Sequence, residues 1–193
     1  YGRPRTNSIN EEHPTNPESI YAASKLTGEI LCQAYANSYG LDISILRLFS
    51  VYGPFSPDHL VTSRIISQLN DKEIKLGNMM IKRDFIFVDD VISAIKLIFK
   101  KSKGFNIYNV GMGKSHSIFE ICNLIKEISG KNIPISTKNS LVRKHDIKEI
   151  MANNQKIKKI GWTPKTELKQ GLKKARKRKI PIKNLCLKKM RRI

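Results

Sequence analysis

The chain has 193 residues, 40% of them hydrophobic, which is enough for one domain with its own core, and no apolar run approaches the ~18 residues that cross a bilayer. The net charge of +20 belongs mostly to residues 155–193, which carry 16 Lys and Arg against one acid, Glu167, so it does not by itself indicate a nucleic-acid-binding protein. Cys32, Cys122 and Cys186 form no Cys-x-x-Cys pair, which speaks against a zinc site or a disulfide framework and favours a reducing cytoplasm.

Predicted helices and strands alternate along the chain. After a polar loop over residues 1–16, apolar residues at helical spacing predict a long helix over residues 19–39, which Gly40 ends. The apolar run over residues 43–49 predicts a buried strand. The remaining predictions are, in order, a loop at 53–57, a helix at 60–70, a strand at 85–88, a helix from residue 89, a strand at 105–110, a helix at 117–129, an edge strand at 133–136, and short helices at 154–159 and 166–178. This alternation is typical of an α/β fold with parallel strand pairing.

Two adjacent acids, Asp89 and Asp90, stand where one predicted helix begins. Adjacent residues at a helix start do not face one site, so we interpret them as capping residues that suit the positive end of the helix dipole. A metal or catalytic carboxylate pair is the less favoured interpretation. The four histidines share no metal-ligand spacing, and no residue is assigned to a metal.

Residues 173–193 form a basic segment with 11 Lys and Arg and no acid. Its weak periodicity predicts a partly disordered tail, separate from a folded domain over residues 1–172. Such a tail could bind nucleic-acid phosphates or anionic lipid. A solvated extension is the favoured interpretation, and a nucleic-acid partner is not expected.

Tyr21 and Lys25 stand four residues apart in a predicted helix, so they lie on one side of it, one turn apart. This arrangement suits hydride transfer, in which a substrate hydroxyl loses its proton while its carbon loses a hydride. A tyrosinate can accept the proton, and a nearby ammonium stabilises it and lowers the ordinary phenol pKa of ~10. The alternative is a Tyr at the edge of the core beside a solvated Lys, and the pair alone does not decide between them.

Six other segments accompany this pair in a fixed order. They are Tyr1-Gly2, Ile45 to Pro54, Arg83 to Val91, Tyr108 to Gly113, Arg143 to Asp146 and Ile160 to Pro164. Together with residues 12–29, which hold Tyr21-Ala22-Ala23-Ser24-Lys25, they resemble the extended short-chain dehydrogenase/reductases. The resemblance is to the NAD-dependent nucleotide-sugar epimerases and dehydratases of that family, and it covers about residues 1–172.

The resemblance implies an α/β fold: the carboxyl-terminal part of a Rossmann-like doubly wound sheet with a small α/β substrate-binding subdomain. It implies NAD as cofactor and a nucleotide sugar as substrate. The implied reaction is a transient oxidation of the sugar, followed by inversion or loss of water. Epimerisation is favoured, because residues 22–24 are Ala-Ala-Ser and contain no dehydratase-type acid pair. UDP, GDP and dTDP sugars all stay open as substrates.

The same resemblance implies roles for individual residues. Tyr21 would be the catalytic acid/base, and Lys25 would hold the nicotinamide ribose and lower the pKa of Tyr21. Phe49 would lie beside the nicotinamide. Ser50 stands where many members have an Asn that touches the substrate, and its hydroxyl can still donate and accept hydrogen bonds.

Arginine side chains are the candidates for binding the diphosphate. A nucleotide diphosphate is doubly anionic and a guanidinium binds it bidentately, which favours Arg83 and Arg143. Asp146 could hold a ribose hydroxyl or orient Arg143. The alternatives are an ion pair of Arg83 with a neighbouring Asp and a solvated position for Arg143. Arg47, inside a predicted strand, is expected to pair with an acid within the fold.

Three other residues are interpreted as structural. Gly111 and Gly113 are expected to form a turn, because a lone Gly-x-Gly is a weak phosphate-loop signal. Trp162, with Pro164, is expected to anchor the terminal helix to the core.

The resemblance also implies a missing part. The Gly-x-x-Gly-x-x-Gly loop that binds the dinucleotide pyrophosphate is absent, and the third catalytic residue, a Ser or Thr, would precede Tyr1. We therefore expect an incomplete domain, inactive alone, with an exposed strand edge and an uncovered apolar face. The resemblance implies that the full-length form is a homodimer through the helix that bears Tyr21 and the helix before it, which is missing here. The rival hypotheses are a binding protein whose basic tail contacts nucleic acid, and a truncated remnant without function.

Overall fold

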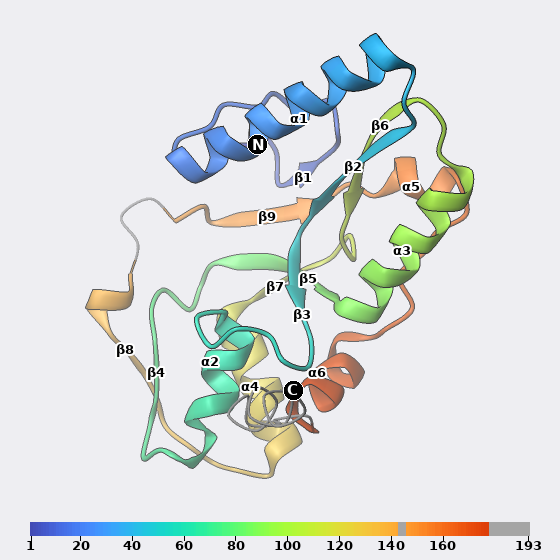
Figure 1. Ribbon diagram of the computed structural model, residues 1–193. Coiled ribbons are helices and arrows are strands. Elements are labelled where there is room, and N and C mark those ends of the chain that lie inside the picture. Colours follow the sequence, from blue (N-terminus) through green and yellow to red (C-terminus); the bar gives the residue numbers. More distant parts are fainter. Residues whose placement is uncertain (143–145, 178–193) are drawn as a thin grey trace, which may run out of the picture.

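The fold alternates helices and strands as the sequence predicts, in a computed structural model that describes residues 1–142 and 146–177 (Figure 1). The strands are β1 (Ser8–Ile9), β2 (Ile43–Leu48), β3 (Ser50–Tyr52), β4 (Ile74–Leu76), β5 (Lys82–Phe87), β6 (Phe105–Val110), β7 (Ser115–Ser117), β8 (Ile135–Thr137) and β9 (Glu149–Ala152). The helices are α1 (Ile20–Tyr39), α2 (Val61–Ser67), α3 (Val88–Lys101), α4 (Ile118–Ser129), α5 (Gln155–Lys159) and α6 (Leu168–Lys177), with 3-10 turns η1 (Gln68–Asn70) and η2 (Asn139–Leu141). Arg143 and residues 178–193 lie outside the described part of the chain.

Most strands pair in parallel, as the alternation of helices and strands predicts. β2 and β6 pair over six residues, from Ile43 opposite Phe105 to Leu48 opposite Val110. A second sheet has the order β1-β9-β5-β3, with each neighbouring pair parallel, and β7 joins β5 in antiparallel orientation. β4 and β8 form a third, small parallel pair. The expected α/β class is therefore confirmed.

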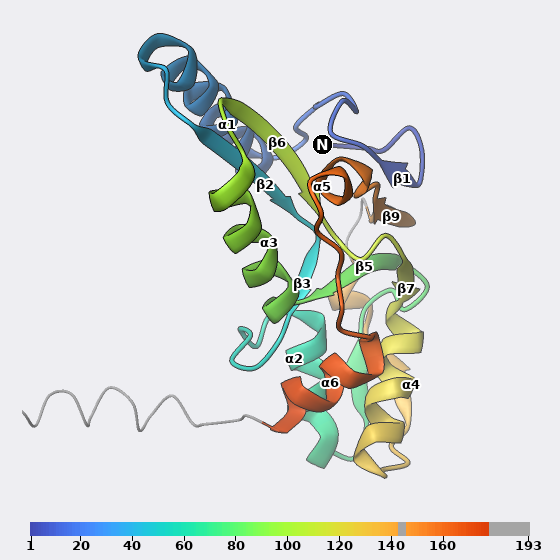
Figure 2. The ribbon, with the colours of Figure 1, turned by 90° about the vertical axis from the view of Figure 1, so that its right-hand side faces the viewer.

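The elements fall into two parts. Figure 1 shows α1 on one side of the β2–β6 pair and α3 on the other, which is the layering of a doubly wound sheet. Helices α2, α4 and α6 gather with β4 and β8 at the other end of the molecule (Figure 2). These two parts match the expected piece of a Rossmann-like sheet and the expected small α/β subdomain.

Strand β5 separates two hydrophobic cores, because successive side chains of a strand point to opposite faces. Phe85 and Phe87 pack in the larger core with Tyr52, and Ile86, between them, packs in the smaller core with Trp162. The larger core fills the part with α2, α4 and α6, and the smaller one lies beneath α3 and α5. Strand β5 thus contributes side chains to both cores, as does β3 through Tyr52 and Val51.

Helix ends follow local signals in two cases. The Ser19 hydroxyl accepts the Ala22 N–H at the start of α1, and Gly40 ends that helix in the left-handed region, at φ 65°. Ser117 and Glu120 form a reciprocal capping box at the start of α4. The predicted ends of both helices are confirmed.

Asp89 and Asp90 lie in the first turn of α3, where they suit the positive end of the helix dipole as predicted, but the prediction that they cap the helix is wrong. Phe87 is the N-cap residue and provides no side-chain cap, while the two acids lie inside the first turn. Asp90 is buried, and its carboxylate instead accepts the backbone N–H groups of Lys165 and Thr166 at 2.9 and 3.0 Å. These bonds tie the start of α3 to the segment that leads into α6.

Part of the surface is apolar and uncovered. Within the described residues, β2 pairs with β6 on one edge only. On α3, Ile95 is 50% exposed and Phe99 is 90% exposed, and they lie four residues apart on one flank. The expected strand edge and uncovered apolar face are present. No helix in the described ranges is long and apolar enough to cross a membrane.

The folded part extends beyond the predicted boundary at residue 172. Helix α6 continues to Lys177, and Ala175 packs in the larger core beside Leu172. Helix α6 lies within the helix predicted at 166–178, and its buried residues show that residues 173–177 are folded.

Candidate active site

Tyr21 and Lys25 lie on one side of α1, near its amino-terminal end, as their spacing predicts. The Lys25 ammonium nitrogen lies 5.4 Å from the centroid of the Tyr21 ring. The Tyr21 side chain is 72% exposed, and Lys25 is exposed as well. The two groups therefore face open space in the described part of the chain, where a ligand can reach both.

Phe49 and Ser50 lie where β2 passes into β3. The Phe49 N–H donates to the Val110 carbonyl at 3.1 Å, and Ser50 is opposite Phe85 in the β3–β5 pairing. Both side chains are half-buried. They stand at the carboxyl end of β2, the end at which parallel α/β sheets bind ligands.

Arg83 and Asp146 come together although 63 positions separate them. The Arg83 Nη2 atom lies 3.9 Å from the Asp146 Oδ1 atom. Arg83 Nη1 also donates to the carbonyls of Lys82 and Ile147, at 2.8 and 2.7 Å. Asp146 thus lies beside Arg83, whereas its predicted partner Arg143 lies outside the described residues.

Asp84 is fully buried and holds the Gly-x-Gly turn. Its carboxylate accepts N–H groups from Met112 at 2.7 Å, Gly113 at 2.8 Å and Ala152 at 3.0 Å. Burial raises the pKa of Asp84, and these three hydrogen bonds act in the opposite direction. A Cβ atom on Gly111 would lie 2.5 Å from the Ala152 methyl group. The turn is therefore packed against β9, which supports its structural interpretation.

Arg47 pairs with an acid inside the fold, as expected, and the acid is Glu29 of α1. The Arg47 Nη2 and Nε atoms donate to the Glu29 carboxylate at 2.6 and 2.9 Å. The guanidinium also lies 4.4 Å from the centroid of the Tyr1 ring. The sequence prediction did not name this acid. Glu29 is the one acid in α1, so the sequence of the helix could have identified it as the partner of Arg47.

Trp162 is buried, and its indole N–H donates to the Ser93 hydroxyl at 2.8 Å. This contact joins the segment before α6 to α3, which agrees with the expected anchoring role.

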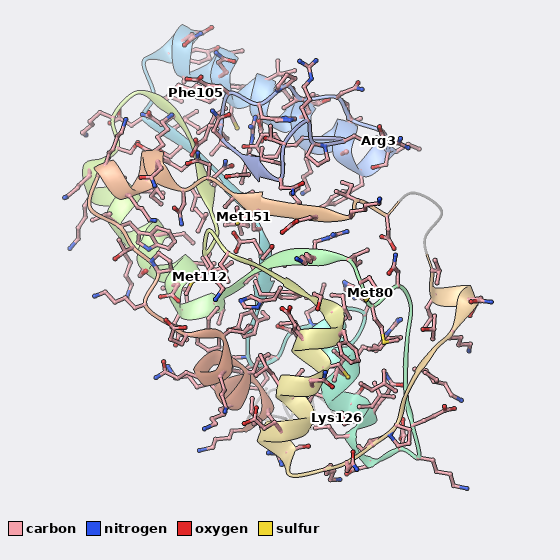
Figure 3. The ribbon with its side chains drawn as sticks, turned by 180° about the vertical axis from the view of Figure 1, so that it is seen from behind. Arg3, Met80, Phe105, Met112, Lys126 and Met151 are labelled. Atoms are coloured by element: carbon pink, nitrogen blue, oxygen red, sulfur yellow. The ribbon has the colours of Figure 1, made fainter. Side chains whose placement is uncertain are left out.

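The described surface includes two clefts to consider, and sequence reasoning singled out Asp146 in the first and no residue of the second. The first, of about 430 Å³, is polar and includes Asp146. Its lining is Arg3, Pro4, Asn7, Asp146, Ile147, Lys148 and Glu149. The second, of about 400 Å³, is mainly apolar and is lined by Asn78, Met79, Met80, Phe119, Thr137 and Val142. Arg3, which lines the first cleft, and Met80, which lines the second, lie in different parts of the molecule (Figure 3). Among the described residues, no group of His, Cys, Asp and Glu could hold a metal ion.

Comparisons with known proteins agree with this arrangement. The chain matches the GDP-mannose 4,6 dehydratase family over residues 1–175. It is 33% identical over 181 residues to a putative UDP-glucose 4-epimerase of Methanocaldococcus jannaschii, which covers 90% of this chain and 57% of that relative. The chain therefore spans little more than half of that relative's length.

Solved structures give the same result. A UDP-N-acetylglucosamine 4-epimerase from Methanobrevibacter ruminantium M1, in complex with UDP-N-acetylmuramic acid, superposes with a TM-score of 0.85 at 28% identity, over 92% of this chain and 58% of that one. A UDP-glucuronic acid 4-epimerase from Bacillus cereus, in complex with UDP-glucuronic acid and NAD, gives 0.83 at 30% identity, over 92% of this chain and 57% of that one.

The match over residues 1–175 includes the Tyr21–Lys25 helix, the β2–β3 junction and the Arg83–Asp146 pair. Both superposed structures hold a nucleotide sugar, and the Bacillus cereus structure also holds NAD. The chain belongs to the GDP-mannose 4,6 dehydratase family, within the NAD-dependent nucleotide-sugar epimerases and dehydratases of the extended short-chain dehydrogenase/reductase type.

Proposed function

We propose that this chain is the acid/base and substrate-binding part of an NAD-dependent nucleotide-sugar epimerase. The observation that carries the proposal is the Tyr21–Lys25 pair, with the ammonium 5.4 Å from the ring centroid and both groups accessible to a ligand. The alternative interpretation, a Tyr at the edge of the core beside a solvated Lys, requires the Tyr21 side chain to pack against the core, and a side chain that is 72% exposed does not support such packing.

The chemistry follows from the two side chains. Tyr21, as the phenolate, accepts the proton of a sugar hydroxyl while the carbon of that hydroxyl loses a hydride. Lys25 stabilises the phenolate with its positive charge and donates to a ribose hydroxyl. Bound NAD supplies the hydride acceptor. Tyr21 would then return the proton to the sugar carbonyl oxygen, and the carbon would be inverted if the hydride returned to its other face.

Other residues would hold the substrate. Ser50 can donate to and accept from a sugar hydroxyl, and Phe49 offers an apolar surface for the nicotinamide ring. Arg83 brings a guanidinium to the diphosphate, with Asp146 beside it at 3.9 Å to orient it. Arg143 remains a candidate for the same diphosphate. Inversion is favoured over loss of water, because residues 22–24 carry no acid.

The cofactor-binding half is proposed to cover the uncovered face. Ile92, Ile95 and Phe99 recur along one flank of α3, the flank away from Ser93 and its bond to Trp162. That flank and the free edge of β2 together fit a further parallel strand and its helix. The proposed division is therefore a folded part up to about residue 177, preceded by a dinucleotide-binding half and followed by the basic tail.

The outer face of α1 supports a homodimer. Lys25 and Glu29 are the only charged residues of this 20-residue helix, and the face away from them is uncharged. On that face Ile20, Leu31 and Tyr35 are 91%, 55% and 55% exposed. An uncharged helix face of this length fits a second copy of itself across a two-fold axis. The free thiols Cys32 and Cys122 are consistent with the proposed cytoplasmic compartment.

The test uses this chain joined to the dinucleotide-binding half that precedes it. Purified protein is incubated with NAD and with UDP, GDP and dTDP sugars. The products are separated by chromatography, and their masses are measured by mass spectrometry. An epimer has the mass of its substrate, whereas a dehydration product is lighter by one water.

Two matched variants identify the acid/base. Tyr21→Phe removes one exposed hydroxyl and should lower kcat by about 10²–10⁴-fold. Tyr39→Phe, on the same helix and 69% exposed, should leave kcat unchanged. Equal activity of the two variants, or activity of the present chain alone, would refute the proposal.

A further inference from the structure

Little apolar packing within the described residues holds the first half of α1. Ala36, in the last turns, is the one buried residue of the helix. Tyr21, Lys25 and Glu29 follow each other at intervals of four residues, so Glu29 lies two turns from Tyr21 on nearly the same side. The contacts of Glu29 therefore bear on where Tyr21 and Lys25 stand.

Glu29 is bound by the planar end of Arg47. Arg47 Nη2 donates to Glu29 Oε2 at 2.6 Å, and Nε donates to Oε1 at 2.9 Å, so the pair is bidentate. The two side chains are only 13% and 18% exposed. A bidentate pair that is mostly withdrawn from water is stronger and more directional than a surface pair.

The same guanidinium contacts two further segments. Its Nη1 atom donates to the Glu11 carbonyl at 3.1 Å, and its face lies on the Tyr1 ring. The Tyr1 hydroxyl donates to Asn109 Oδ1 at 2.5 Å, and the Asn109 N–H donates to the Glu11 carboxylate at 2.7 Å. Arg47 thus joins α1, β2 and residues 1–11, and through them β6.

Burial alone would lower the pKa of Arg47, but its hydrogen bonds to Glu29 and its contact with Tyr1 outweigh that effect, so its pKa lies above the ordinary value. The cation therefore persists at every pH at which the fold is studied. Arg47 is also only two residues before Phe49 and three before Ser50 in one extended strand segment. One side chain thus connects the acid/base helix to the proposed cofactor and substrate contacts.

We propose that Glu29 and Arg47 are positioning residues, which fix the first half of α1 so that Tyr21 and Lys25 stand at a set distance from Phe49 and Ser50. This inference rests on the proposed function for its catalytic consequence. Displacing a reacting group by about 1 Å can cost on the order of 10²-fold in rate. A lysine at position 47 cannot replace the arginine, because a single ammonium cannot bind two carboxylate oxygens and a carbonyl in one plane while stacking on a ring.

The first measurement uses the present chain and needs no activity. Amide hydrogen exchange is followed by mass spectrometry in Arg47→Lys, Glu29→Gln and the double variant. Lys103→Gln is the matched control, because Lys103 makes an exposed ion pair with Asp42 beside the other end of β2. Arg47→Lys should raise exchange about tenfold in the first half of α1 and leave α4 unchanged, and Lys103→Gln should change neither.

The second measurement uses the same variants in the chain joined to its dinucleotide-binding half. Arg47→Lys and Glu29→Gln should each lower kcat by about tenfold or more, with KM for the nucleotide sugar within about twofold. The double variant should be no slower than the slower single one, because both remove one interaction. Lys103→Gln should keep the original kcat.

The outcomes separate the two proposals. If the unsubstituted joined protein acts on no nucleotide sugar, the proposed function fails, and the exchange pattern alone decides the positioning role. Exchange that rises evenly over the whole chain overturns the positioning role, because Arg47 would then stabilise the fold in general. Exchange that does not rise at all also overturns it, because Arg47 would then hold no part of α1 in place. In an active protein, an unchanged kcat in Arg47→Lys overturns it too.

Discussion

Replacing Asp84 by asparagine should destabilise the fold by about 1–3 kcal/mol at neutral pH. The carboxylate accepts one N–H on Oδ1, from Met112, and two on Oδ2, from Gly113 and Ala152. Asparagine has the same shape but one acceptor oxygen. It can keep the two bonds of Oδ2 only by turning its NH₂ group toward the Met112 N–H. One backbone donor then lies unsatisfied beside a fully buried side chain, which is the source of the expected cost.

Urea unfolding of the chain measures this cost, with the midpoint expected to fall and the slope to stay constant. Asp89→Asn is the control, because Asp89 lies in the first turn of α3, is 63% exposed in its side chain and contacts only Lys174 at 3.9 Å among the ion pairs described. The control should change stability by less than about 0.5 kcal/mol. If Asp84→Asn is as stable as Asp89→Asn, relief of the buried charge outweighs the lost hydrogen bond, and the reasoning is refuted.

The pH dependence of the same variant has a definite sign. Burial raises the pKa of Asp84, against the pull of its three N–H donors. A carboxyl with a raised folded pKa contributes stability fully below its unfolded pKa and loses it as pH rises through the folded pKa. The substituted asparagine does not titrate, so the stability lost on substitution should be larger at about pH 4 than at about pH 7. A loss of stability that grows with pH would show that the hydrogen bonds to the ionised carboxylate have a larger effect on the pKa of Asp84 than its burial.

Two further predictions concern glycines and thiols. Gly111→Ala would bring a methyl group 2.5 Å from that of Ala152 and should lower the free energy of unfolding by about 1–3 kcal/mol in urea unfolding. A Cβ atom at Gly28 would have nothing within 4 Å, so Gly28→Ala should stabilise α1 by about 0.5–1 kcal/mol. Burial raises the pKa of Cys122 to about 11. In a variant without the third cysteine, a thiol reagent near neutral pH should therefore label the half-buried Cys32 much faster than Cys122. Comparable labelling rates of the two thiols would contradict the burial of Cys122.

The parts of this fold that sequence predicts well are those with local signals. The first long helix has a capping Ser19, apolar residues at helical spacing and Gly40 as its end, and it forms with those bounds to within one residue. The strand over 43–48 and the helix over 118–129 follow equally local patterns. In each of these cases, the residues that determine the element lie within it or beside it.

The parts that sequence misses depend on distant partners. β1 has two residues and exists because Ser8 and Ile9 pair with Met151 and Ala152, more than 140 positions away. Two residues carry no periodicity, so no local pattern distinguishes them from a loop. Asp90 shows the same limit in a side chain: its neighbours suggest a cap, but the N–H groups that it accepts lie 75 and 76 positions further along the chain.

The polar groups of the fold and those of the candidate site differ in how many of their possible hydrogen bonds are made within the described chain. The buried carboxylates of Asp84 and Asp90 accept three and two hydrogen bonds from the described chain, and each of these bonds joins segments that are distant in sequence. Tyr21 and Lys25, by contrast, contact little but each other. A polar group with its hydrogen bonds filled cannot bind a ligand without losing them, whereas an accessible one can. Exposure of Tyr21 and Lys25 is therefore what a ligand-facing pair requires, and the nearly buried Arg47–Glu29 pair beneath them is what gives that exposed pair a defined position.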